Sequence, residues 1–256
     1  MIHPTAIIDP KAKIAADVTI GPYSVIGAEV VIDSGTWIGP HVVINGPTKI
    51  GKNNQIFQFA SVGEMPQDKK FQGEETYLEI GDDNIFRESC TINRGTTQGG
   101  SHTKIGNGNL FMAYVHIAHD CIVGNETVFA NSASLSGHVT VDDYAILSGF
   151  CAVRQFTYIG AYSFVAGGTM VVKDVLPYII VSGDPAEPFG LNLVGLQRRG
   201  FSSETISLLK QGYRAIYRKN LNTQEAIAVL QELAIDCPEI ELFITAIERA
   251  ERGIVR

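Results

Sequence analysis

Residues 114–121 bring together two histidines and a carboxylate, His116, His119 and Asp120. A histidine can take up a proton near neutral pH, and a carboxylate beside it can orient the imidazole ring. An isolated histidine is more often an ordinary surface residue. In this sequence a surrounding repeat fixes the direction of the side chains, so these residues are a candidate catalytic or metal-binding site.

The elements that must position this site follow from a repeat of six residues. An apolar residue recurs at every sixth position, and the series continues one residue out of step after residue 100. A period of six fits neither a helix face nor an alternating strand, but it fits a solenoid in which each short strand has one inward side chain. The repeated positions are Ile8, Ile14, Ile20, Ile26, Ile32, Ile38, Ile44, Ile50, Ile56, Val62, Ile80, Phe86 and Ile92, then Ile105, Phe111, Ile117, Val123, Phe129, Leu135, Val141, Leu147, Val153, Ile159, Val165 and Val171.

Three such hexads would close one triangular coil of 18 residues, and successive coils would stack at the ~4.8 Å spacing of neighbouring strands. The predicted fold is mainly β, a left-handed parallel β-helix of hexapeptide repeats over residues 1–190. Two polar insertions, near 64–77 and 95–103, are expected to form loops. The first keeps the register of the repeat, and the second shifts it by one residue.

The last part of the chain has a different pattern. After Val171 the repeat ends, and we expect an extended connector followed by a C-terminal helical domain over residues 191–256. Three short helices are predicted there, the first starting near Ser202, the second at a capping box that begins with Asn222, and the third with Pro238 in its first turn. These helices would form an α-helical cap on the open end of the solenoid.

Composition narrows the class of function. The chain has 256 residues, 45% of them apolar, and a net charge of −7, which argues against a nucleic-acid-binding surface. No apolar run approaches the ~18 residues of a membrane span, and the N-terminus lacks the pattern of a secretory signal. Widely spaced cysteines without a C-x-x-C pair suggest free thiols in the cytoplasm, which is the expected location. The cysteines are Cys90, Cys121, Cys151 and Cys237.

Counting by whole coils brings distant residues together. His119, Gly137 and Gln155 are 18 residues apart and should form one ladder on the outside of the solenoid, with His138 beside Gly137. In this ladder His119 can act as a general base, oriented by Asp120 or by another group. Since Gly137 has no side chain, its N–H would be accessible to a developing oxyanion. This geometry favours acyl transfer to a hydroxyl group.

A zinc site is the alternative, because histidine is a common zinc ligand and some hexapeptide proteins are γ-class carbonic anhydrases. In that class the first two histidines are five residues apart, whereas His116 and His119 are three apart. Arg154 would also bring a positive charge close to the metal. We therefore predict no metal.

Three longer motifs carry a family resemblance. They are PFGLNLVGLQRRGF at residues 188–201, QDKK at 67–70 and INRGT at 92–96. Together with His-Ile-Ala-His-Asp, these motifs resemble the bacterial UDP-N-acetylglucosamine 3-O-acyltransferases, which catalyse the first step of lipid A biosynthesis. The resemblance extends over nearly the whole chain.

The resemblance implies a homotrimer with active sites between neighbouring solenoids. The reaction would transfer a (3R)-3-hydroxyacyl group from acyl carrier protein to the 3-hydroxyl of UDP-N-acetylglucosamine. No cofactor is implied, because the phosphopantetheine belongs to the acyl-carrier-protein substrate. His119 would be the general base, Asp120 would hold it, and the Gly137 N–H would stabilise the oxyanion.

The resemblance also implies binding residues. Asp68, Lys70, His116, His138 and Gln155 would hold the sugar nucleotide. From the C-terminal region, Asn192, Arg198 and Arg199 would reach the nucleotide or the phosphopantetheine. Phe164 and Gly167 would line the acyl-chain groove.

Two positions depart from the family pattern. Arg154 replaces a histidine, and Val194 replaces a glutamate, and both border the nucleotide or donor site. These changes leave open an acceptor such as a 3-amino analogue of the sugar nucleotide. A basic helical side is also predicted to dock the acidic carrier protein, and it comprises Lys210, Arg214, Arg218 and Lys219.

Overall fold

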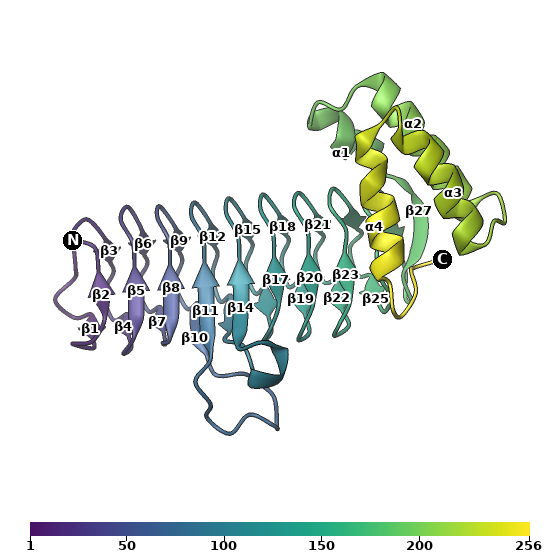
Figure 1. The fold of residues 1–256 in the computed structure, drawn as a ribbon. Coiled ribbons are helices and arrows are strands. Elements are labelled where there is room, and N and C mark those ends of the chain that lie inside the picture. Colours follow the sequence, from purple (N-terminus) through teal and green to yellow (C-terminus); the bar gives the residue numbers. More distant parts are fainter.

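The computed structural model describes residues 1–256 as a triangular prism of stacked coils with helices at its C-terminal end (Figure 1). The predicted fold class, a left-handed parallel β-helix with C-terminal helices, is confirmed. Each coil contributes one short strand to each of three sheets, and all strand pairs are parallel except the last, β26 with β27.

The bounds of the strands follow the hexad positions closely. The nine-stranded sheet contains β1 Ile7–Ile8, β4 Val25–Ile26, β7 Val43–Ile44, β10 Ser61–Glu64, β13 Thr91–Asn93, β16 His116–Ile117, β19 Ser134–Leu135, β22 Ala152–Val153 and β25 Met170–Val171. The eight-stranded sheet contains β2 Lys13–Ile14, β5 Val30–Ile32, β8 Thr48–Ile50, β11 Tyr77–Ile80, β14 His102–Ile105, β17 Ile122–Val123, β20 Thr140–Val141 and β23 Tyr158–Ile159. The ten-stranded sheet contains β3 Thr19–Ile20, β6 Trp37–Ile38, β9 Gln55–Ile56, β12 Ile85–Phe86, β15 Leu110–Phe111, β18 Val128–Phe129, β21 Ile146–Leu147, β24 Phe164–Val165, β26 Ile179–Ser182 and β27 Glu187–Leu191.

The core is a set of columns running along the prism axis. Every hexad residue from Ile20 onward is buried, because each strand points one apolar side chain inward and the next coil covers it. Phe86, Phe111 and Phe129 stack directly, with ring centroids 4.8 and 5.0 Å apart. This stacking fixes the coil-to-coil register to which the surface residues are tied.

Three edges of the prism carry the turns between sheets. At each edge the second turn residue commonly has a positive φ, such as 60° at Asp120, 61° at His138 and 63° at Phe156. Few residues other than glycine adopt this left-handed conformation. The first edge joins the nine- to the eight-stranded sheet, the second joins the eight- to the ten-stranded sheet, and the third joins the ten- to the nine-stranded sheet. Their turns include residues 119–120, 137–138 and 155–156 at the first edge, 143–144 and 161–162 at the second, and 149–150 and 167–168 at the third.

Both insertions leave the prism as loops at the first edge, as Figure 1 shows. One connects β10 to β11, and the other connects β13 to β14 and contains the short 3-10 helix η1, Thr97–Gly99. Equivalent residues are 30 positions apart across the first loop and 25 across the second, against 18 in regular coils. The first loop therefore adds whole hexads. The second loop adds one residue more than a whole hexad, which confirms the predicted shift of register.

The prediction of an extended connector after Val171 is wrong. The chain makes a further, shorter coil, in which Asp174 lies 16 residues beyond Tyr158. β26 then pairs with β24, and β27 folds back against it. Because this coil is two residues short, its apolar residues leave the six-residue series and the repeat is no longer visible in the sequence.

Four α-helices follow, one more than predicted. They are α1 Leu193–Arg198, α2 Ser203–Tyr217, α3 Thr223–Ala234 and α4 Glu241–Arg249, with the 3-10 helix η2 Pro238–Ile240 before α4. Ser202 caps α2, Asn222 forms the predicted capping box of α3, and Pro238 opens η2. None of the helices is long and apolar enough to cross a membrane.

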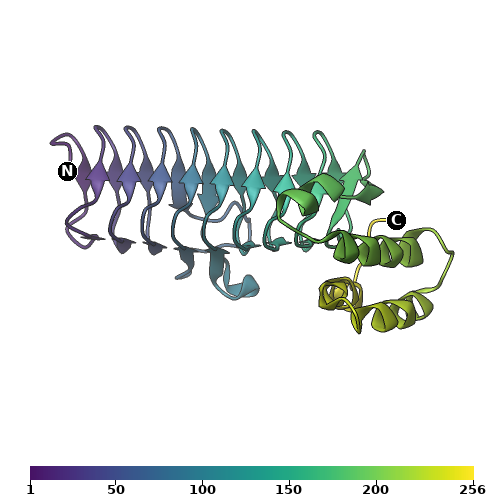
Figure 2. The ribbon, with the colours of Figure 1, turned by 90° about the horizontal axis from the view of Figure 1, so that it is seen from above.

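The helices pack at the C-terminal end of the prism and extend to one side of it (Figure 2). Tyr178, fully buried in the last coil, packs edge-on against Phe243 of α4 with ring centroids 5.3 Å apart, and its hydroxyl donates to the Glu239 carbonyl at 2.9 Å. The helices and the solenoid therefore share one continuous apolar core.

Candidate active site

His119 and Asp120 form a dyad in the turn between β16 and β17. Nδ1 of His119 donates to Oδ2 of Asp120 at 2.7 Å. The two residues are adjacent in the chain, and the positive φ of Asp120 belongs to the turn geometry that lets its carboxylate reach the preceding ring. Nε2 of His119 makes no hydrogen bond within the chain and is the nitrogen available to a substrate.

The second loop holds Asp120 in place. The backbone N–H and the hydroxyl of Thr96 donate to its two carboxylate oxygens at 2.7 and 2.6 Å, and the Asp120 N–H donates to the Thr103 hydroxyl at 2.8 Å. Burial by itself would raise the pKa of Asp120, but the hydrogen bonds from His119 and Thr96 outweigh burial and lower the pKa. The carboxylate therefore remains charged and can stabilise a protonated His119.

Gly137 lies one coil beyond His119, as predicted. A Cβ atom on Gly137 would come within 2.5 Å of Cε1 of His119, so only glycine leaves room for the ring. The N–H of Gly137 has no acceptor within the chain. A free backbone donor therefore lies next to the imidazole, which is the arrangement that an oxyanion-stabilising group requires.

His138 and Phe156 extend the site along the first edge. The His138 ring lies edge-on to His119 with centroids 5.1 Å apart, its Nε2 is 3.6 Å from Oδ2 of Asp120, and it stacks on Phe156 at 4.3 Å. Burial lowers the pKa of His138, while the negative charges of Asp120 and Asp68 oppose this change. His138 is therefore favoured as a neutral ring that can donate or accept a hydrogen bond.

The other residues predicted at this site divide into two groups. Asp68 and Lys70 belong to the first loop, where the Lys70 N–H donates to Asp68 at 2.9 Å, and Gln155 is exposed at the first edge one coil beyond Gly137. His116 lies on the nine-stranded sheet, where its Nδ1 is 2.7 Å from the Thr91 hydroxyl and burial lowers its pKa. His116 is thus on a separate ladder from His119.

The remaining predicted residues are not brought to the first edge. Asn192 is buried, caps α1 by accepting from the Gly195 N–H, and donates to the Tyr162 carbonyl at 2.9 Å. Arg199 lies at the second edge, 4.4 Å over the Tyr144 ring, and Arg198 is exposed beside it.

Phe164 and Gly167 belong to a different side of the prism. Phe164 is in β24, and Gly167 is in the turn that follows, at the third edge. Within one chain, the predicted site residues are therefore distributed over all three edges.

Sequence reasoning missed three contacts of the site. Phe156 could have been found by adding one coil to His138. The INRGT motif contains Thr96 but does not predict its contact with Asp120, and no motif singles out Thr103. The position of Thr96 depends on the path of an irregular loop, which no period predicts.

His119, Asp120 and His138 form a group of metal-ligating residue types, and their possible ligand atoms lie within 4.8 Å of one another. The donor set does not fit zinc, however. Both Asp120 oxygens already accept hydrogen bonds from Thr96, and Nδ1 of His119 is bound to the same carboxylate. The ring nitrogens of His119 and His138 are then the only ligand atoms left free, one fewer than the three protein ligands of a catalytic zinc ion.

Two family models match the chain. Residues 174–255 match the model described as UDP-N-acetylglucosamine O-acyltransferase, domain 2, and residues 1–34 and 102–137 match the bacterial transferase hexapeptide model. The match to the first model covers the shortened coil and the helices, and the second covers regular coils of the prism.

Whole-chain relatives agree with these models. The acyl-[acyl-carrier-protein]--UDP-N-acetylglucosamine O-acyltransferase of Thiobacillus denitrificans is 56% identical over 100% of this chain and 99% of its own. The structure of LpxA from Acinetobacter baumannii has a TM-score of 0.97 at 49% identity, covering 100% of this chain and 99% of that one. The UDP-N-acetylglucosamine acyltransferase of Francisella novicida has a TM-score of 0.98 at 43% identity, covering 100% and 94%. The chain is an acyltransferase and belongs to the UDP-N-acetylglucosamine O-acyltransferase family.

Proposed function

We propose that this enzyme transfers a (3R)-3-hydroxyacyl group from acyl carrier protein to the 3-hydroxyl of UDP-N-acetylglucosamine, the first step of lipid A biosynthesis. The observation that carries the proposal is the free Nε2 of His119 beside the free N–H of Gly137. A base and an oxyanion donor on adjacent coils are the two groups that acyl transfer to a hydroxyl requires.

In the proposed mechanism, Nε2 of His119 removes the proton of the sugar 3-hydroxyl as its oxygen attacks the thioester carbonyl carbon. The carbonyl oxygen becomes an oxyanion that accepts a hydrogen bond from the Gly137 N–H. Collapse of the tetrahedral intermediate breaks the carbon–sulfur bond, and protonated His119 returns the proton to the departing thiolate. Asp120 stabilises the imidazolium between the two steps.

The sugar nucleotide would bind along the first edge. His138 and Gln155 lie there on successive coils, and Asp68 lies close enough for its charge to affect the pKa of His138. Lys70 would supply a cation from the same loop. His116, on the neighbouring sheet, would contact the acceptor from the side.

We propose that the active enzyme is a trimer whose sites lie between copies. His119, Arg199 and Gly167 lie at the first, second and third edges of one prism, so a single chain cannot surround one substrate with all of them. If copies pack side by side, the first edge of one copy can face the second or third edge of its neighbour. Arg198 and Arg199 would then reach the nucleotide diphosphate, Asn192 would fix their helix, and Phe164 and Gly167 would line the acyl groove.

The carrier protein would dock on the helical region. Lys210, Arg214 and Lys219 line a single hollow between α2 and α3, which suits the acidic surface of an acyl carrier protein. Arg218, predicted on the same side, lies instead over the Tyr213 ring at 6.0 Å and lines a different hollow. The docking surface therefore comprises three of the four predicted cations.

Other features support the wider assignment. We propose residues 1–190 as the acyltransferase domain and residues 191–256 as the helical domain, in line with the change from β27 to α1 at Asn192. The four cysteines are unpaired and buried, which supports a cytoplasmic enzyme. The mechanism uses only side chains and backbone, so it requires no cofactor.

The decisive experiment offers purified enzyme UDP-N-acetylglucosamine and a 3-hydroxyacyl carrier protein, with and without a chelator. We expect O-acylated product that is insensitive to the chelator and is lost in His119→Ala. A parallel reaction with the 3-amino sugar nucleotide tests the acceptor. This test is needed because Arg154 and Val194, the two positions that depart from the family pattern, are both exposed. Faster acylation of the amine would overturn the choice of hydroxyl, and activity abolished by the chelator would overturn the metal-free mechanism.

A further inference from the structure

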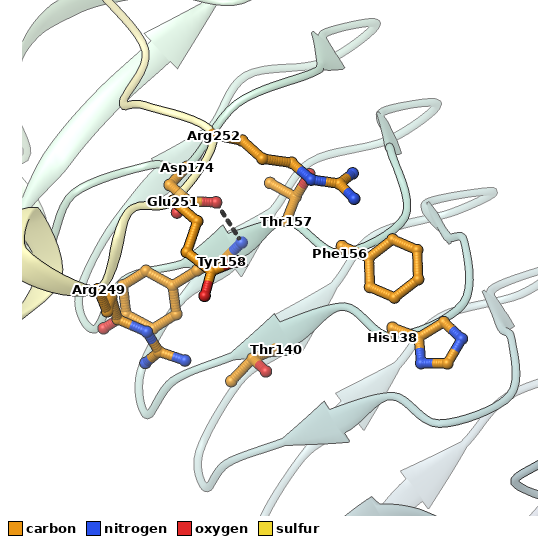
Figure 3. A pocket seen from close by; sticks show the side chains of 9 residues that line it. All are labelled: His138, Thr140, Phe156, Thr157, Tyr158, Asp174, Arg249, Glu251 and Arg252. Atoms are coloured by element: carbon orange, nitrogen blue, oxygen red, sulfur yellow. Dashed lines mark hydrogen bonds between the residues drawn. The ribbon is translucent and has the colours of Figure 1, made fainter. Parts of the chain in front are cut away.

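A pocket of about 260 Å³ lies beside the site, on the eight-stranded sheet near its C-terminal end (Figure 3). It begins at His138 and Phe156 and is closed on the other side by the segment that follows α4. Asp174 fixes this segment through backbone hydrogen bonds with Gly253 and Val255 at 3.2 and 2.9 Å. The pocket is thus built by the solenoid and the C-terminus together.

Two guanidinium groups dominate the pocket. Arg249 lies over the Tyr158 ring at 4.0 Å and Arg252 over the Phe156 ring at 4.7 Å. Neither has a carboxylate oxygen within 4.0 Å. Stacking on a ring fixes the plane of a guanidinium and leaves its N–H groups free to bind an oxyanion.

The acidic groups near the pocket are already bound or point to solvent. Oδ1 of Asp174 accepts from the Tyr158 N–H at 2.9 Å, and Asp142 accepts from the Tyr158 hydroxyl. Glu251 is exposed. The two arginines therefore form no ion pair at close range. Their charges act on Asp142 and Asp174 from farther away, where they oppose the rise that burial causes in the pKa of both carboxyls. Arg252 also donates a weak hydrogen bond of 3.4 Å to the Gln155 carbonyl.

The pocket lies in line with the dyad. Asp120, His138 and Phe156 occupy the same turn position in three successive coils, so Phe156 is roughly 10 Å from Asp120 at the usual strand spacing. The guanidinium of Arg252 lies 4.7 Å from the Phe156 ring. A phosphopantetheine arm has as many backbone bonds as about five residues and spans roughly 16 Å when extended. An arm whose phosphate lies between the arginines can therefore place its thioester at His119.

We propose that Arg249 and Arg252 bind the phosphodiester group of the acyl donor's phosphopantetheine arm. This inference rests on the proposed function. It assigns the pocket to the donor, whereas the sugar nucleotide occupies the turns around His138 and His119. The C-terminal segment then has a role in the reaction as well as in packing, because it holds the donor's phosphate at a fixed distance from the base.

The test compares two donors that differ only in the phosphate, 3-hydroxyacyl-phosphopantetheine and 3-hydroxyacyl-pantetheine, with UDP-N-acetylglucosamine as acceptor. Wild type should use the phosphorylated donor with a kcat/KM about tenfold higher or more, since charge-assisted hydrogen bonds to phosphate are lost in the other. In the double variant Arg249→Gln/Arg252→Gln this preference should disappear. Activity with acyl-pantetheine and the KM for the sugar nucleotide should stay unchanged.

Lys173→Gln serves as the matched control. Lys173 is an exposed cation next to Asp174 in the shortened coil, and it does not line the pocket. It should keep the preference of wild type. The inference is overturned if the double variant keeps the preference, or if it loses activity with both donors equally. A raised KM for the sugar nucleotide in the double variant would mean that the two arginines bind the phosphates of the nucleotide instead. A wild-type enzyme that acylates no sugar nucleotide with either donor would contradict the proposed function itself.

Discussion

The proposed base depends on a turn residue that is held from outside the repeat. Asp120 accepts hydrogen bonds from His119 and from the backbone and hydroxyl of Thr96. Its side chain is only 1% exposed, so water cannot replace these donors. The orientation of His119 therefore depends on a loop that contributes nothing to the core.

Thr96→Val should weaken the dyad without removing it. The loss of one hydrogen bond to a buried charge should cost about 1.5–3 kcal/mol and reduce kcat about tenfold or more. Thr96→Ser, which keeps the hydroxyl, should restore most of the rate. Equal loss in both variants would show that the hydroxyl alone does not sustain the rate, which would contradict the assigned role of the hydrogen bond.

The same variant should change the acid stability of the protein. The folded pKa of Asp120 is lowered, so Asp120 contributes stability above its unfolded pKa of about 3.9, and this stability is lost as pH falls through the folded pKa. Thr96→Val should raise that folded pKa. Acid unfolding followed by circular dichroism should therefore begin at a higher pH, and an unchanged midpoint would contradict the assigned hydrogen bonds.

Gly137→Ala should displace the imidazole, because the added methyl group would overlap Cε1 of His119. A shift of about 1 Å in a reacting group can cost about a hundredfold in rate, so we expect that loss in kcat. Gly149→Ala is the control, since Gly149 occupies the same turn position at the third edge and its Cβ would approach only a carbonyl oxygen at 3.3 Å. Similar losses in both variants would point to general damage to the turns.

At the scale of elements, the stacked coils supply stability and the register of the site. Phe111 is fully buried between Phe86 and Phe129. Phe111→Ala should lower the free energy of unfolding by about 3–5 kcal/mol because of the cavity it leaves. Chemical denaturation would measure this, with Phe189→Ala, at a site 76% exposed, expected to change stability by less than about 1 kcal/mol. A small effect at Phe111 would mean that the coils can collapse around the gap.

The period of six predicted the prism, the ladder of His119, Gly137 and Gln155, and the separate ladder of His116. It predicted these because each coil repeats the geometry of the one before. It could not predict the shortened coil through Asp174, whose length departs from the period, nor the contact of Thr96, which depends on an aperiodic loop. The short helix α1 lacks the length that makes helical periodicity visible.

At the scale of the whole molecule, the predicted residues occupy three edges that face away from one another. The proposed trimer brings His119 of one copy to Arg198 and Arg199 of the next. The two kinds of residue would then belong to different chains at every site. This arrangement makes a prediction about mixtures of inactive chains.

Mixed trimers of His119→Ala chains and Arg198→Ala/Arg199→Ala chains should recover part of the activity that each lacks alone. Some sites in such trimers combine an intact His119 with intact arginines from a neighbour. Mixing His119→Ala with Asp120→Asn should recover none, because the dyad lies within one chain. Co-expression with two affinity tags followed by kinetic assay would measure this, and a lack of recovery in trimers of confirmed mixed composition would argue against shared sites.

The unequal lengths of the two loops affect how this protein can tolerate changes in length. In the loop between β10 and β11, whole hexads can be gained or lost while the inward residues of later strands stay inward. The loop between β13 and β14 holds one residue more than whole hexads. Trimming that loop by six residues would leave a surplus residue for a corner to absorb, whereas trimming by seven would restore a regular coil but remove the donors that fix Asp120. The evolution of this loop is therefore constrained in its length as well as in its composition.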